Sequence, residues 1–128
     1  MMQQRMINAA NAPQPVNAYC QAMEVSGGTR ILFISGQGGV RVDGTIPATM
    51  EEQAELAWRN VGSQLAAAGM GFGNLVKVTM IIRHESEILA SRPARLAALG
   101  DHRPASTVII GGLVNPAWKI EIEGIAYA

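Results

Sequence analysis

The 128-residue sequence predicts a single α+β domain, residues 1–128, with a mixed β-sheet and two helices packed on one face. Three observations predict this class. Runs of β-branched and apolar residues alternate with two segments of helical period, and further strand-like runs follow one another near both ends of the chain. A hydrophobic content of 48% with only 16% charged residues excludes intrinsic disorder.

The N-terminal part of the chain favours extended structure interrupted by turns. An irregular arm rich in Asn and Pro reaches to about residue 18 and has room for one short strand near residues 5–7. Two apolar runs follow, at 22–25 and 30–34. The Gly-Gly dipeptide between them predicts a β-hairpin, because glycine reaches positive φ without steric cost. We expect the glycine-rich segment 35–39 to be a loop.

The first helix has recognisable ends. Thr49 and Glu52 have the spacing of a capping box, in which each side chain accepts a hydrogen bond from a free backbone N–H. Apolar residues then recur at helical spacing, and Gly69 suits a left-handed C-terminal cap. We therefore expect a helix from about residue 50 to about residue 68.

Strands and one more helix fill the second half of the chain. Residues 75–82 predict a buried strand, and residues 85–99 predict a helix ended by Gly100, where Pro93 allows a kink or a late start. Two further strands are expected, at 106–110 and 118–127.

The last strand alternates strictly between apolar and charged residues. Ile120 and Ile122 fall on one face, and Lys119, Glu121 and Glu123 fall on the other. Two carboxylates on one face could serve as a general base and its partner. A solvated, charged face of an antiparallel sheet is the alternative interpretation.

Charge and cysteine content exclude several classes of protein. Ten basic and ten acidic residues cancel, which removes the general electrostatic case for nucleic-acid or anionic-membrane partners. A single cysteine, Cys20, cannot form an intramolecular disulfide. No secretory signal and no run long enough to span a bilayer is evident, so we expect a cytoplasmic protein.

Metal and cysteine chemistry are not predicted. The borderline or soft ligands His84, His102 and Cys20 lack the short paired spacings of zinc sites. Nothing in the local sequence would lower the pKa of Cys20, which suggests a small buried hydrophobe. The glycines at 36, 38 and 39 lack the lysine of a P-loop, although such a segment could still present N–H groups to a carboxylate. We expect neither a metal nor a cofactor.

Six short motifs, in order along nearly the whole chain, resemble those of the RidA family. They are 17–22 (family G-P-Y-x-Q-A), 35–37 (S-G-Q), Gln53 with Asn60 and Val61 (E-Q-x6-N-[LV]), 76–79 (V-K-x-T), 103–106 (P-A-R-S) and 120–123 (V-E-I-E). The resemblance implies a chorismate-mutase-like fold of the bacillus type, assembled as a homotrimer with clefts between subunits. It also implies hydrolysis of a small enamine or imine, such as 2-aminoacrylate, to a keto acid and ammonia.

The resemblance also implies roles for individual residues. Glu121 matches the family's glutamate that activates water, and Tyr19 matches its cleft tyrosine. Ser35, Gly36 and Gln37 match the segment that lines the cleft and binds substrate. An endoribonuclease activity, a label that some members carry, is not expected, because the chain has no basic, aromatic-rich stripe.

Position 106 departs from the family pattern. The arginine that clamps the substrate carboxylate falls on Ser106, whose hydroxyl offers one neutral hydrogen bond where a guanidinium offers a charged fork. Arg103, Arg92 and His102 are the neighbours in sequence that could replace the charge, and Arg103 and Ser106 are the predicted substrate-binding residues here.

The departure at position 106 leaves two functions open. One is a deaminase with an altered or reduced substrate range, for which Ser106→Arg should raise the activity toward 2-iminopropionate. The other is a non-catalytic, trimeric protein that binds a small metabolite.

Overall fold

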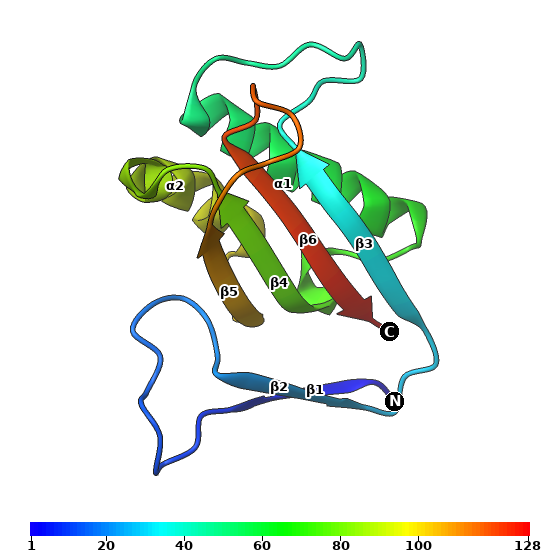
Figure 1. Cartoon of the computed structure of the whole chain (residues 1–128). Coiled ribbons are helices and arrows are strands. Elements are labelled where there is room, and N and C mark those ends of the chain that lie inside the picture. The colour runs from blue at the N-terminus through cyan, green and yellow to red at the C-terminus, as the bar shows by residue number, and fades with distance from the viewer.

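A four-stranded mixed β-sheet forms the body of the molecule, with the strand order β3-β6-β4-β5 (Figure 1). The computed structural model describes all residues, 1–128. Strands β3 (Ile31–Gly38) and β4 (Leu75–Ile82) each pair antiparallel with β6 (Ile120–Tyr127). Strand β5 (Ala105–Ile110) pairs in parallel with β4, which requires a crossover connection. The predicted mixed sheet is confirmed.

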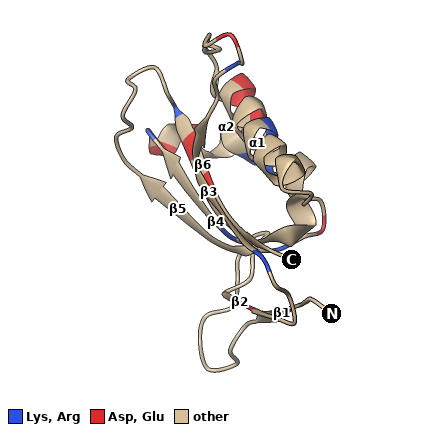
Figure 2. Ribbon diagram, turned by 90° about the vertical axis from the view of Figure 1, so that its right-hand side faces the viewer, with Lys and Arg blue, Asp and Glu red and all other residues tan.

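Two helices, α1 (Met50–Ala67) and α2 (Ile88–Leu99), cover one face of this sheet (Figure 2). The hydrophobic core lies between them and the strands, and it includes Trp58 and Leu65 from α1 and Ile120 and Ile122 from β6. The opposite face of the sheet carries no covering layer, as Figure 2 shows. Neither helix has the length and apolar character needed to cross a membrane.

Local signals set the ends of α1 as predicted. The Thr49 hydroxyl oxygen accepts a hydrogen bond from the Glu52 N–H at 3.2 Å, but no return bond to the Glu52 side chain forms, so only half of the capping box is present. At the other end Gly69 has a φ of +70°. The Met70 N–H donates to Leu65 O at 2.8 Å, which closes a Schellman motif.

We expect Thr49→Ala to lower the free energy of unfolding by about 0.5–2 kcal/mol, the usual cost of losing a side-chain cap. The measurement is the denaturant midpoint at a fixed chain concentration. Ser63→Ala is the matched control, because Ser63 is an exposed hydroxyl residue in the middle of the same helix. An equal midpoint for the two variants would contradict the capping role.

The predicted hairpin of residues 22–25 and 30–34 is wrong. Strand β2 (Ala22–Ser26) pairs instead with β1 (Gln3–Ile7), as a separate ribbon at one end of the main sheet (Figure 1). The two glycines lie against the two ends of the chain, Gly27 against the backbone of Met1 and Gly28 against Ala128. Gly27 has a φ of +76°, and a Cβ on Gly28 would lie 2.6 Å from Ala128 O. The chain then crosses to β3, which pairs with β6.

The glycine-rich segment 35–39 was predicted to be a loop. This prediction is wrong, because the segment as far as Gly38 is the end of strand β3. The register of β3 against β6 shifts between Ile34 and Gln37, so Ser35 and Gly36 form a β-bulge. Helix α2 begins at Ile88, after a 3₁₀ turn at Glu85–Glu87, so its start is three residues later than predicted; Pro93 lies inside the helix and does not set this start.

Candidate active site

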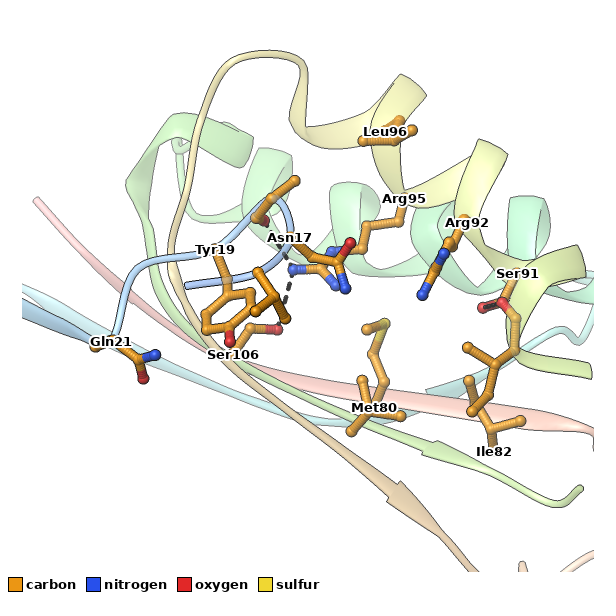
Figure 3. Close-up of a pocket in the computed structure, with 14 residues that line it drawn as sticks. Asn17, Tyr19, Gln21, Met80, Ile82, Ser91, Arg92, Arg95, Leu96 and Ser106 are labelled. Carbon is orange, nitrogen blue, oxygen red and sulfur yellow. Dashed lines mark hydrogen bonds between the residues drawn. The ribbon is translucent and has the colours of Figure 1, made fainter. Parts of the chain in front are cut away.

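A cavity of about 530 Å³ lies between helix α2, strands β4 and β5, and the arm segment that precedes β2 (Figure 3). Its floor is apolar, formed mainly by Met80, Ile82 and Val108 of the sheet. Polar side chains enter from the rim, with Tyr19 from the arm and Ser106 from β5 among them. We call this cavity the α2 groove.

The arm is held against the groove by backbone contacts at Cys20. The Cys20 N–H donates to Pro104 O at 3.3 Å, and Cys20 forms an isolated parallel bridge with Ala105 at the start of β5. The side chain is only 1% exposed, and burial raises the pKa of its thiol. Cys20 therefore anchors the segment that places Tyr19, and its thiol is held in the neutral form.

Arg95 of α2 is the charged side chain at the centre of the groove. Its Nη2 donates to Ala18 O at 2.9 Å and to the Ser106 hydroxyl oxygen at 3.3 Å (Figure 3). Its Nε is buried and has no hydrogen-bond partner. Burial lowers the pKa of Arg95, and the nearby charges of Arg103 and Arg92 lower it further.

No carboxylate neutralises this group. The three ion pairs of the chain join Arg5 to Glu24, Arg59 to Glu55 and Lys119 to Glu87, all outside the groove. An uncompensated cation in a half-buried site is unfavourable unless an anion binds there. The groove of this neutral chain is therefore a local positive site.

Sequence reasoning did not identify Arg95, although a signal exists. Ile88, Ser91, Arg95 and Leu99 follow one another at intervals of three or four residues, which places them on one face of α2. Ser91 and Leu99 of this face are buried. A charged residue on the core-facing side of a helix is unusual, so its presence at this position indicates a functional role for the charge.

The other candidates for replacing the missing charge fall in different places. Arg92 lines the groove, and Figure 3 shows its guanidinium above Met80. Arg103 is absent from the lining, because its Nη1 donates to the carbonyl oxygens of Gly100 and His102 at 2.6 and 3.1 Å. His102 is tied to the start of β4, with its Nε2 2.6 Å from Leu75 O.

Glu121 lies on the uncovered face of the sheet, as the alternation in the last strand predicted. It pairs in register with Ile81, whereas its neighbour Ile122 pairs with Met80 of the groove floor. Directly opposite residues share a face, so Glu121 and the groove lie on opposite sides of one sheet. One copy of the chain therefore does not bring Glu121 together with Tyr19.

The β-bulge of β3 lies against Glu121. A methyl group on Gly36 would overlap the Glu121 carboxylate, so glycine is what allows the carboxylate to rest on the strand backbone. The Gln37 side-chain amide donates to Ser35 O at 3.0 Å, which ties the bulge to itself. The structure thus groups Ser35, Gly36 and Gln37 near Glu121, and Tyr19 and Ser106 in the α2 groove.

The uncovered face also presents large apolar side chains to solvent. Phe33 is 73% exposed, Ile31 57% and Ile109 46%. A shallow hollow of about 450 Å³ beside Phe33 is lined by Lys77 and Glu123 among others. Exposed apolar patches of this kind mark interaction surfaces in soluble proteins.

Comparisons with known proteins agree with this architecture. The model of a family described as Endoribonuclease L-PSP matches residues 9–128. A 2-iminobutanoate/2-iminopropanoate deaminase from Dermatophagoides farinae is 32% identical over 128 residues, covering 98% of this chain and 97% of that protein. A protein of the same name from Capra hircus is 31% identical over 124 residues, covering 95% and 88%. The Yersinia pestis Rid-family protein YyfB, titled as of unknown function, has a TM-score of 0.84 at 21% identity over 98% of each chain.

Proposed function

The chain belongs to the RidA family, also described as the endoribonuclease L-PSP family, and on that premise we propose that it is an enamine/imine deaminase. In this reaction water adds to the C=N carbon of a small imine, the C–N bond breaks, and a keto acid and ammonia leave. The observation that carries the proposal is a positive, acid-free groove in a chain about 30% identical to proteins named as imine deaminases.

The proposed active unit is a homotrimer with sites between subunits. Within one chain Glu121 and the α2 groove lie on opposite faces of the sheet, so two copies are needed to bring them together. A head-to-tail contact closes into a ring when its rotation is one third of a turn. Such a contact would also cover the exposed Phe33 and Ile31. A scattering mass of a single 13.6 kDa chain at micromolar concentration would overturn this part of the proposal.

Each predicted residue has a task in this arrangement. Glu121 of one subunit accepts a proton from water as the water attacks the imine carbon, because a carboxylate within hydrogen-bond reach can act as a general base. Gly36 and the bulge around it hold that carboxylate in place. Tyr19 and Ser106 of the neighbouring subunit line the substrate side of the cleft and supply hydroxyl groups.

The serine at position 106 changes the expected substrate range. A serine hydroxyl cannot form the bidentate, charged contact that the family's arginine makes with a carboxylate. Arg103 contributes positive potential, since its charge acts on Arg95, but its own donors are used on backbone carbonyls. We therefore expect a range that differs from that of the family members with the arginine.

The test is the decay of 2-iminopropionate, generated in place from an amino acid by an oxidase, with and without the protein. We expect the protein to speed the release of ammonia in proportion to its concentration. If 2-iminopropionate decays at the same rate with folded, trimeric protein as without protein, the deaminase function is overturned and the non-catalytic, metabolite-binding alternative is favoured. An imine without a carboxylate, assayed in parallel, reports the substrate range.

A further inference from the structure

Arg95 has hydrogen-bonding capacity that the protein does not use. Of its donors, only Nη2 is occupied, by Ala18 O and the Ser106 hydroxyl oxygen. Nε is buried without a partner, and a buried donor left unpaired costs free energy. Nη1 has no hydrogen-bond partner either and is not buried, so its N–H groups are the donors that the guanidinium presents to the α2 groove (Figure 3).

We propose that Arg95 binds the carboxylate of the substrate, so that the cation absent from strand β5 is supplied by helix α2. The proposal rests on the proposed function only for the identity of the reaction. It names what the groove would hold of such a ligand, one carboxylate beside a short apolar side chain, as in a small 2-imino or 2-keto acid.

Ser106 has a positive use in this arrangement. The serine is small enough for the Arg95 guanidinium to reach its hydroxyl, at 3.3 Å, from the helix on the other side of the groove. The hydroxyl oxygen accepts from Arg95, so the hydroxyl proton remains available to donate to a ligand oxygen. Arginine and serine together can thus hold one carboxylate from two directions.

Charge and shape select the ligand class. Arg92 and Arg103 add positive potential at Arg95, and no carboxylate is paired with it, so an anion is favoured over a neutral ligand. The floor of Met80, Ile82 and Val108 offers no hydrogen-bonding group to a polar substituent. A short alkyl side chain is what this floor accommodates.

The geometry also reverses one expectation from the sequence. Arginine at position 106 was expected to raise activity by restoring the family's charge. Because the Arg95 guanidinium already lies within hydrogen-bonding distance of that side chain, a second guanidinium would meet a like charge in the same space. Ser106→Arg alone is therefore expected to weaken anion binding.

The experiment measures the binding of 2-oxobutanoate and of its neutral amide by calorimetry, without any need for turnover. We expect the wild type to prefer the acid, and Arg95→Gln to bind it about 10- to 150-fold more weakly, the range for one charge-assisted hydrogen bond. Arg59→Gln is the matched control, because Arg59 is an exposed helical arginine outside the groove. Circular dichroism and scattering verify that each variant folds and assembles.

A charge swap keeps the proposal testable if removal of Arg95 harms folding. Arg95→Ser combined with Ser106→Arg moves the guanidinium from α2 to β5, and we expect it to recover most of the affinity that each single variant loses. Equal affinity of folded Arg95→Gln and wild type, or no preference of the wild type for the acid, would overturn the role of Arg95. Arg95-dependent binding without turnover would overturn the deaminase function and leave this assignment standing.

Discussion

Glu121→Gln is expected to lower kcat/KM for 2-iminopropionate by about 10²- to 10⁴-fold, the usual contribution of a positioned general base. Glutamine keeps the shape of the side chain and its hydrogen-bonding reach, but it cannot take a proton from water. The residue is half-buried at the sheet surface, so the fold and the assembly should survive the change. The measurement compares steady-state rates of folded trimers, with 2-oxobutanoate affinity as a second readout that Glu121→Gln leaves largely intact.

Glu123→Gln separates the two interpretations of the charged face of β6. Glu123 lies two residues further along the same face of the strand and is exposed. If Glu121 acts alone, the Glu123 variant loses only a small part of the activity. An equal loss for both variants would show that the two carboxylates act as a pair. Full activity of Glu121→Gln would remove Glu121 from the mechanism altogether.

Mixing two impaired variants is expected to restore about a quarter of the wild-type activity, because each site of the proposed cyclic trimer draws on two chains. Arg95→Gln carries an intact Glu121, and Glu121→Gln carries an intact α2 groove. In randomly mixed trimers half of the grooves are intact, and half of those face an intact Glu121. The chains are unfolded together, refolded at equal amounts and assayed.

The control for this experiment is wild type refolded with the double variant Arg95→Gln/Glu121→Gln. In this control mixture, sites shared between chains give about one quarter of the wild-type activity. Sites that lie within one chain give about one half. Absence of recovery in the first mixture, with mixed trimers verified by mass spectrometry of tagged chains, would show that Glu121 and the groove of one chain act together. That result would contradict the shared site.

The parts of the fold that the sequence predicts are those with local causes. Thr49 and Gly69 mark the ends of α1 because capping involves only neighbours in the chain. The faces of β6 follow from strict alternation, which put Glu121 on the correct side. Strand pairing is not local in this sense. Gly27 is required by the close approach of Met1 and Gly28 by that of Ala128, about a hundred residues away, so this dipeptide does not indicate which strand β2 joins.

The candidate site was predictable in its parts and not in its arrangement. Tyr19, Ser106 and Glu121 were proposed from their positions in short motifs, yet no spacing in the sequence tells that the sheet separates Glu121 from the other two. Arg95 was not predicted although it is nearer to Ser106 in the sequence than Arg92, because only the packing of α2 against β5 decides which arginine reaches the serine hydroxyl. The residue that reaches Ser106 comes from the opposite wall of the groove, eleven positions earlier in the chain.

Because the arm is anchored at Cys20, the reactivity of the Cys20 thiol reports how often the arm separates from β5. The Cys20 residue is buried and its backbone bridges to Ala105 of β5, so a thiol reagent can react only when this joint separates. The modification rate then measures the population of the open form, as amide hydrogen exchange does for a backbone group. Since the same arm carries Tyr19 at the groove, a ligand that bridges the arm and α2 slows the labelling of Cys20 in proportion to its occupancy.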